Sequence, residues 1–300
     1  MPSAPESRPL RPFVVPALLV VLCLIWGSTW WAIRVCLVDQ PPLTSAALRF
    51  LVAGSALALA MPALRRLDPL PPPPTWLWLA TGSLSFAGSY GILYVAEQTV
   101  PGGVAAVLWA IFPLLMATSG VFVLGEVLRP RQLLGFFVSF AGIVTVFVGD
   151  LGGGGPGGLG AALFLLLSPI VSAVGTTLVK KFGKGTSSLR LNRNGMLFGA
   201  VLLAIAAWLR EDPLAMAWSA RGLAATLYLA LCGTALTFGG YFWLLQRVPA
   251  SRLALISYVT PVLAVLLGVA VGDGTFGWPL GAGTTLVVAG VALVVQQGRR

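Results

Sequence analysis

Side chains that could do covalent chemistry are scarce in this sequence. It has no histidine, which excludes histidine acid–base catalysis, histidine-ligated metals and histidine proton relays. Its cysteines, Cys23, Cys36 and Cys232, form no CxxC pair, and we interpret them as small buried hydrophobes. There is no candidate nucleophile–base pair and no cluster of metal ligands. We therefore expect no enzyme, no cofactor and no metal.

Arg49 is the only arginine well inside an apolar run. A cation in hydrocarbon is costly unless it is paired or hydrated, so Arg49 is a candidate to bind a substrate carboxylate or to form an extracellular gate. The alternative is a structural pair or snorkelling. Its expected partner by depth is Glu97, near the end of the next run.

Carboxylates are absent from the middle of every run. Proton-driven exporters usually titrate an embedded acid, and Glu97 is the best candidate here. Because Glu97 lies near a run's end, facilitated export is as plausible as proton exchange. Glu126 lies close to Arg129 and Arg131, and we expect it to form a structural or gating pair.

Several amphipathic aromatic residues lie within apolar runs. Trp and Tyr usually occupy membrane interfaces, so rings near mid-run suit a cavity for an organic solute, with helix packing as the alternative. The candidate substrate-binding residues, besides Arg49, are Trp26, Trp30, Tyr90, Tyr94, Trp109, Tyr241 and Tyr258.

Pro113 and Pro261 lie about halfway along their runs. Proline inside a helix removes a backbone hydrogen bond and kinks the axis, and freed carbonyls beside a cavity can bind substrate. The alternative is a kink that serves packing only. We assign both prolines, with Glu97 and Glu126, as hinge or gating candidates.

The elements that must position these residues are membrane-spanning helices. Hydrophobic residues make up 57% of the 300 residues, charged residues 9%, and the mean hydropathy is +0.92. Each apolar run of about 20 residues can cross a hydrocarbon core of about 30 Å. The fold class predicted is an all-α integral membrane protein with ten transmembrane helices. The expected spans are 13–35, 44–64, 75–98, 102–125, 132–149, 161–180, 194–209, 223–246, 251–271 and 278–296.

The second half of the sequence repeats the first at an offset of 148 residues. Thirteen positions in the window 98–149 match without a gap, among them Pro101 with Pro249 and Pro113 with Pro261. We predict a first five-helix repeat at 13–149, a glycine-rich linker at 150–160 and a second five-helix repeat at 161–297. Five is odd, so the repeats are inverted, an arrangement that gives alternating access a simple physical basis.

Lys and Arg are divided unevenly between the two sides of this topology. The side of the N-terminus carries 15, the other side carries 3, and the remaining one is Arg49. By the positive-inside rule both termini are cytoplasmic. The net charge of +10 therefore reports topology rather than nucleic-acid binding. The expected partners are a lipid bilayer and a small-molecule substrate, with the protein functional as a monomer.

The pattern resembles the drug/metabolite transporter superfamily in its EamA-type branch. The residues that carry the resemblance are Trp26-Gly27-Ser28-Thr29-Trp30, Pro101 with Pro113, Gly125-Glu126 followed by Gly135 and Gly142, Pro249 with Pro261, and Gly283 with Gly290. A second glutamate is missing, because Gly274 stands where the repeat would place it, so the acid is not doubled.

The resemblance implies ten helices around a central cavity and export or exchange of small metabolites. Within the superfamily the chain is similar to the YddG-type amino-acid exporters. The expected function is export of amino acids, including aromatic ones, across the cell inner membrane. The alternative is a proton-coupled multidrug or lipophilic-cation exporter.

Overall fold

The computed structural model describes residues 13–64, 68–124, 129–150, 158–245, 250–273 and 277–295, and within these ranges it is helical without strands. The first half contains α1 (Val14–Asp39), α2 (Pro42–Leu64), α3 (Thr75–Thr81), the π-helix η1 (Gly82–Gly88), α4 (Ser89–Ala96), α5 (Gly102–Trp109), α6 (Phe112–Leu124) and α7 (Pro130–Asp150). The second half contains α8 (Gly158–Phe182), α9 (Ser188–Arg210), the 3-10 helix η2 (Pro213–Ala215), α10 (Ala220–Leu227), the π-helix η3 (Tyr228–Leu236), α11 (Thr237–Leu245), α12 (Ala250–Ala270) and α13 (Trp278–Val295).

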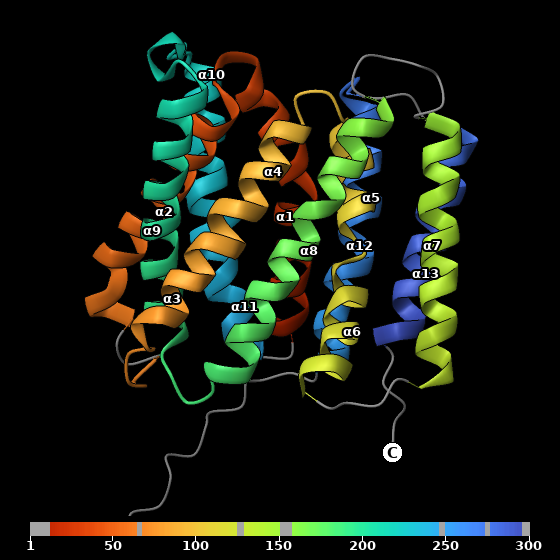
Figure 1. The fold of residues 1–300 in the computed structure, drawn as a ribbon, viewed down its shortest axis with the longest axis horizontal. Coiled ribbons are helices and arrows are strands. Elements are labelled where there is room, and N and C mark those ends of the chain that lie inside the picture. Colours follow the sequence, from red (N-terminus) through yellow and green to blue (C-terminus); the bar gives the residue numbers. More distant parts are fainter. Residues whose placement is uncertain are drawn as a thin grey trace, which may run out of the picture.

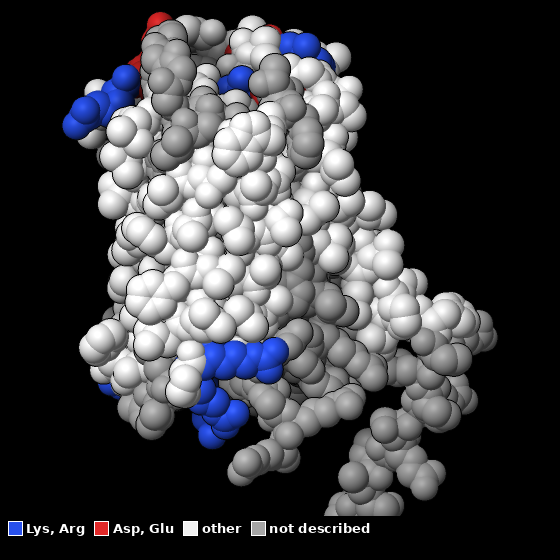
Figure 2. Space-filling model, turned by 90° about the vertical axis from the view of Figure 1, so that its right-hand side faces the viewer, with Lys and Arg blue, Asp and Glu red and all other residues white. Residues whose placement is uncertain are grey.

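The helices lie side by side in one bundle with their axes roughly parallel (Figure 1). Five stretches are long and apolar enough to cross a membrane: α1, α2, α8, α9 and the stretch Gly102–Val123. Charged side chains on the face drawn in Figure 2 gather at the two ends, with a broad uncharged band between them. The protein is therefore a multi-pass membrane protein.

We call the end of the bundle at which α1 begins and α13 ends the terminal end, and the opposite end the distal end (Figure 1). Hydrogen bonds hold the distal end together across the two halves. The carboxylate of Glu211 accepts from the backbone N–H groups of Leu43 (2.7 Å) and Thr44 (3.0 Å), the first residues of α2 after its proline. An acidic side chain from the second half thus caps a helix N-terminus of the first half.

Helices α7 and α13 pack along each other at one edge of the bundle (Figure 1). A Cβ placed on Gly142 would lie 2.7 Å from the carbonyl oxygen of Gly283, and one placed on Gly283 would lie 2.7 Å from the carbonyl oxygen of Gly142. Such distances exclude a side chain, so only glycine permits this close approach. Gly142 and Gly283 are both positions at which the two halves have the same residue. The reciprocal contact explains why glycine is present at these positions in both halves.

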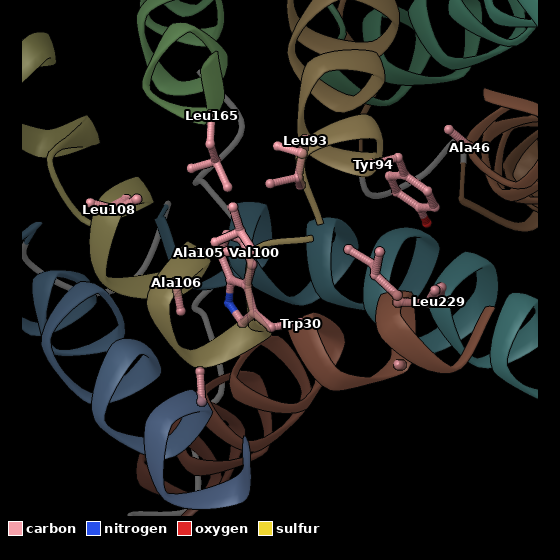
Figure 3. Close-up of a cluster of buried hydrophobic side chains, with 14 of the residues drawn as sticks. Trp30, Ala46, Leu93, Tyr94, Val100, Ala105, Ala106, Leu108, Leu165 and Leu229 are labelled. Atoms are coloured by element: carbon pink, nitrogen blue, oxygen red, sulfur yellow. The ribbon is translucent and has the colours of Figure 1, made fainter. Parts of the chain in front are cut away.

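Other helix contacts also correspond between the halves: α1 packs on α12 as α8 packs on α6, and α2 packs on α9. Helix α1 also packs on α10, and α8 also packs on α4. Helix α5 lies at the centre against α1, α8 and α12, and its residues 102–108 are all buried. Figure 3 shows Ala105 and Ala106 of α5 close to Trp30, within this central core.

Two of the predicted spans contain a π-helical segment. Helix α3 continues through η1 into α4 without a break, and α10 continues through η3 into α11. At the repeat offset of 148, Gly88 corresponds to Leu236, and η1 and η3 end at these two residues. The wide π turn therefore recurs at the same place in both halves. Such turns are rare and often occur at functional sites.

Pro113 lies near the middle of the stretch Gly102–Val123, as predicted, but the stretch is divided there into two helices. The span expected at 102–125 is interrupted at Ala110 and Ile111, and Pro113 is the second residue of α6. Proline is tolerated there because a first-turn N–H has no helical partner to lose. Pro261, in contrast, lies inside the uninterrupted α12.

Helix α9 begins six residues before the predicted start at residue 194, at Ser188. The side chain of Ser187 caps it by accepting from the backbone N–H of Arg190 at 3.1 Å. The prediction followed hydropathy, and the polar first turn of α9 falls below a hydropathy threshold although the cap stabilises it. Residues 125–128, which include Glu126, lie outside the described residues.

Candidate functional site

The guanidinium of Arg49 is enclosed in the core between α2 and η3. Arg49 is 2% exposed. Its Nε donates to Thr234 Oγ1 at 3.0 Å, its Nη1 lies 3.4 Å from the Tyr94 hydroxyl, and its Cζ lies 4.9 Å from the centre of the Tyr90 ring. Among the described residues, the hydrogen-bond acceptors of this cation are neutral hydroxyl groups. The positive charge is therefore desolvated without being neutralised.

The π-helical segment η3 positions the Thr234 hydroxyl that accepts the hydrogen bond from Arg49. Its hydroxyl donates to the carbonyl of Leu229, five residues earlier, at 2.8 Å. Because the one hydroxyl proton is used in that bond, the oxygen lone pairs are directed to the Arg49 Nε. Thr234 is fully buried, so this bond fixes the guanidinium in a water-poor setting.

The predicted pairing of Arg49 with Glu97 is wrong. Glu97 lies in the turn after α4 and is fully buried, yet neither of its carboxyl oxygens has a hydrogen-bond partner among the described residues. Tyr94, one turn earlier on the same helix, makes the contact with Arg49 instead. Depth along a run was the only basis for the prediction, and depth does not determine which way a residue faces.

A polar cluster closes the distal end above Glu97, and we call it the distal clasp. Arg34 donates from Nε to Asp273 Oδ1 at 2.8 Å and from Nη1 to the backbone carbonyls of Glu97 and Gln98. The second oxygen of Asp273 accepts from the backbone N–H of Gly102 at 3.1 Å. The clasp joins α1, the α4–α5 turn and the end of α12, and so connects the two halves.

The sequence analysis did not identify the clasp. Arg34 and Asp273 are separated by 239 residues and are expected only as charges at the ends of spans. A signal was nonetheless present, because they are an arginine and an aspartate predicted at the same membrane surface in a chain with few acidic residues. Such a pair predicts an ion pair that connects the ends of two spans.

Aromatic rings form a continuous path from Arg49 toward the terminal half of the core. Tyr90 meets Phe50 at 4.8 Å between ring centres, and Phe50 meets Phe86 at 5.1 Å. The path continues with Phe86 and Phe238 at 6.4 Å, Phe238 and Trp26 at 6.2 Å, and Trp26 and Tyr241 at 5.7 Å. These separations are within the range of attractive ring contacts. The path crosses α4, α2, η1, α11 and α1.

A second aromatic group branches from α1, where Trp30 lies one helical turn after Trp26. The Trp30 ring is 6.3 Å from that of Trp109, which stacks on Phe112 at 4.9 Å. The indole N–H of Trp109 donates to Ser168 Oγ at 3.1 Å, and Ser168 is 3.0 Å from Ser89 Oγ. The indole of Trp26 is held in the same way by Thr237 Oγ1, at 3.1 Å.

The structure therefore brings together most of the predicted substrate-binding residues. Arg49, Tyr90, Tyr94, Trp26, Trp30, Trp109 and Tyr241 belong to one contiguous set. The side chain of Tyr258 lies outside the described residues, as does Glu126. Neither Pro113 nor Pro261 is among the residues joined by these hydrogen bonds and ring contacts. Sequence analysis missed Thr234, Ser168 and Thr237, since small hydroxyl residues are common in apolar helices.

This arrangement places the Arg49 guanidinium, which can bind a negatively charged group, beside aromatic ring faces. Guanidinium groups bind carboxylates through fixed N–H donors, and aromatic faces bind apolar bodies. Within the described ranges, no three His, Cys, Asp or Glu residues are placed to hold a metal ion.

Comparison with known proteins places the chain in a family. The model of the EamA-like transporter family matches twice, at residues 15–148 and 159–296. The uncharacterized inner membrane transporter YedA of Escherichia coli (strain K12) is 34% identical over 264 residues, which cover 86% of this chain and 82% of that protein. The uncharacterized transporter YvbV of Bacillus subtilis (strain 168) is 27% identical, covering 92% and 90%. One solved structure has a TM-score of 0.67 at 22% identity and covers 93% of this chain and 95% of its own.

These matches confirm the resemblance to EamA-type proteins and the division of the chain into two related halves. Proteins of the family are named as transporters, not as enzymes. The solved structure supports the fold alone. Because the family model matches nearly the whole chain in two copies, this membrane protein belongs to the EamA-like transporter family.

Proposed function

We propose that this protein exports amino acids, including aromatic ones, across the cell inner membrane by alternating access. The substrate carboxylate would bind Arg49, and its side chain would lie against the aromatic path. The observation that carries the proposal is the buried Arg49 guanidinium, whose described hydrogen-bond acceptors are the neutral hydroxyls of Thr234 and Tyr94. A desolvated cation without a counter-ion has a strong affinity for an anion that enters.

The proposed architecture is ten spans arranged as two inverted five-helix repeats around a central cavity. Matching helix contacts support it. The contact of α1 with α12 corresponds to the contact of α8 with α5 and α6. The contacts of α2 with α9 and of α7 with α13 each join two equivalent helices of the repeats. Two similar halves that exchange conformations provide outward-open and inward-open states in a simple way. The positive-inside count supports cytoplasmic termini, and the name of the Escherichia coli relative supports the inner membrane.

Purified protein in liposomes tests this proposal. Vesicles preloaded with one labelled amino acid at a time should release it faster than protein-free vesicles, with aromatic amino acids among the best substrates. A known transporter reconstituted in parallel controls for vesicle quality. No acceleration for any of the twenty amino acids would rule out the proposed substrate class.

The second candidate function is export of lipophilic cations coupled to protons. The observation in its favour is Glu97, a fully buried carboxyl group without a described partner. An embedded acid is the group that such exporters titrate. Transport of a lipophilic cation by the wild type, driven by a proton gradient and abolished by Glu97→Gln, would favour this candidate. Amino-acid release that is insensitive to a proton gradient would count against it.

A further inference from the structure

Glu97 is a buried acid that the distal clasp covers but does not use. Arg34 donates to the backbone carbonyl of Glu97 and not to its carboxyl group. Both carboxyl oxygens are buried and have no hydrogen-bond partner among the described residues. Burial of an unpaired acid is unfavourable, because its polar atoms lose water without gaining another partner. A buried acid without a described partner, in a chain with nine acidic residues, is a candidate to bind a ligand.

Glu97 lies one helical turn after Tyr94, the residue whose hydroxyl contacts Arg49. Tyr94 and Glu97 are three residues apart at the end of α4, a spacing that places side chains on one face of a helix. The Tyr94 hydroxyl lies 3.4 Å from the Arg49 guanidinium, and both Tyr94 and Glu97 are fully buried. The Cα atoms of Tyr94 and Glu97 are therefore about one helical turn, or roughly 5 Å, apart.

The other charged groups near Glu97 are already paired. Arg34 of α1 and Asp273 at the end of α12 form an ion pair at 2.8 Å, and Asp273 also binds the backbone N–H of Gly102. Arg49 of α2 is held by Thr234 and Tyr94. Among the described residues, the buried charged side chains are Arg49 and Glu97, which Tyr94 links along α4 and which form no hydrogen bond or ion pair with each other. A ligand that carries both a negative and a positive group would complement them.

Both charges occur in the same half of the chain. At the repeat offset of 148, Arg49 corresponds to Leu197 and Glu97 corresponds to Leu245. The second copy has neither the cation nor the acid. A single site for one zwitterion requires both charges at the same place, and their confinement to one copy agrees with that requirement.

We propose that Glu97 binds the α-ammonium group of the substrate while Arg49 binds its α-carboxylate. This inference rests on the proposed amino-acid transport and specifies how the same site selects zwitterions. A carboxylate accepts charge-assisted hydrogen bonds from an ammonium group, and such bonds are among the strongest in proteins. The site then discriminates amino acids from simple carboxylates and from amines, each of which leaves one buried charge unpaired.

The test measures binding to the purified full-length protein in detergent, through the shift of its melting temperature with ligand concentration. The probes are L-phenylalanine and 3-phenylpropionate, which differ by the ammonium group. The wild type should bind phenylalanine at least about tenfold more tightly, as expected for a charge-assisted hydrogen bond. Glu97→Gln should abolish this preference by weakening phenylalanine and leaving 3-phenylpropionate unchanged.

Two further variants make the result interpretable. Glu97→Asp keeps the charge and should retain a preference for phenylalanine even where Glu97→Gln is unstable. Asp212→Asn removes an exposed acid and should behave as the wild type. Retention of the full preference in Glu97→Gln, or an equal loss for both ligands, would overturn this inference alone. Failure of the wild type to bind any amino acid would overturn the proposed function as well.

Discussion

The two π-helical segments make contacts that correspond in position but differ in chemistry. Segment η1 packs against α9 of the other half, and η3 packs against α2. At the repeat offset of 148, Phe86 of η1 corresponds to Thr234 of η3, and Arg49 of α2 corresponds to Leu197 of α9. One contact is apolar, and the other contains the buried guanidinium.

Glycines bring the apolar contact together closely. A Cβ placed on Gly82 would lie 2.8 Å from the carbonyl oxygen of Gly195, and one placed on Gly199 would lie 2.8 Å from the Cβ of Phe86. In the polar contact, Arg49 Nε and Thr234 Oγ1 are joined by a hydrogen bond of 3.0 Å. The same π turn therefore forms a close apolar contact in one half and, in the other half, holds the guanidinium that we propose binds the substrate. The proposed site thus lies where the two repeats differ in sequence.

Arg49→Leu should have the largest effect, because it removes the cation from the contact between η3 and α2. The substitution gives α2 the residue that α9 has at the corresponding position. Transport of L-phenylalanine by reconstituted protein should fall at least about 100-fold, because hydrogen bonds to a charged group contribute about 1.5–3 kcal/mol each and about 1.4 kcal/mol is a factor of ten. The measurement is the initial rate of release from liposomes with equal amounts of inserted protein.

Leu197→Met is the matched control in the other half. Leu197 packs against Gly54 of α2, and this volume-conserving exchange in an apolar contact should cost less than about 1.5 kcal/mol in stability and should leave the transport rate near that of the wild type. If Arg49→Leu keeps half of the wild-type rate, the polar contact is not the binding position. If Leu197→Met abolishes transport in a folded protein, the two contacts do not differ in role.

Gly199→Ala tests the close apolar contact. An added methyl group at 2.8 Å from the Phe86 Cβ and 3.0 Å from the Gly82 carbonyl oxygen must separate α9 from η1. Overpacking of this kind costs about 1–3 kcal/mol, so the melting temperature of the purified protein should fall by several degrees. Gly160→Ala is the control, because no atom lies within 4 Å of its added Cβ. Equal melting temperatures for the two variants would contradict this close contact.

Several features of the fold and the site are predictable from the sequence because they depend on the residue itself and its neighbours along the chain. Arg49 stands out because a cation in an apolar run is expensive wherever the run packs. The repeated glycines of α7 and α13 are predictable as equivalent positions, and the structure supplies their reason, a reciprocal close contact between the two helices. The aromatic residues near mid-run are predictable as a set, although not the order of their contacts.

Other features depend on how helices far apart in the sequence rotate against each other. Thr234 looks like any threonine in an apolar run, and only the π turn of η3 brings it to Arg49. The distal clasp joins Arg34 to a residue 239 positions away. Glu97 and Arg49 have similar depths, but the direction that each side chain takes is set by packing. Hydropathy and depth contain no information about rotation, so these contacts required the structure.

Thr234→Val makes the smallest change of the three substitutions, because it removes one oxygen from the polar contact and keeps the shape of the side chain. The Arg49 Nε then loses its acceptor at 3.0 Å, and the carbonyl of Leu229 loses a donor. An unmade buried hydrogen bond costs about 1–3 kcal/mol, so the apparent affinity for phenylalanine should weaken about tenfold. The concentration dependence of release from liposomes measures this affinity, and Arg49 keeps its charge, so some transport should remain.

Thr285→Val on α13 is the matched control, since Thr285 is exposed and bonds only to the carbonyl of Gly281 within its own helix. It should leave the affinity unchanged. A tenfold loss in Thr234→Val with an unchanged melting temperature would mean that the hydroxyl orients the guanidinium for substrate. A loss of stability with unchanged affinity would instead make Thr234 a packing residue like its counterpart Phe86, and the two π-helical contacts would then differ in polarity but not in function.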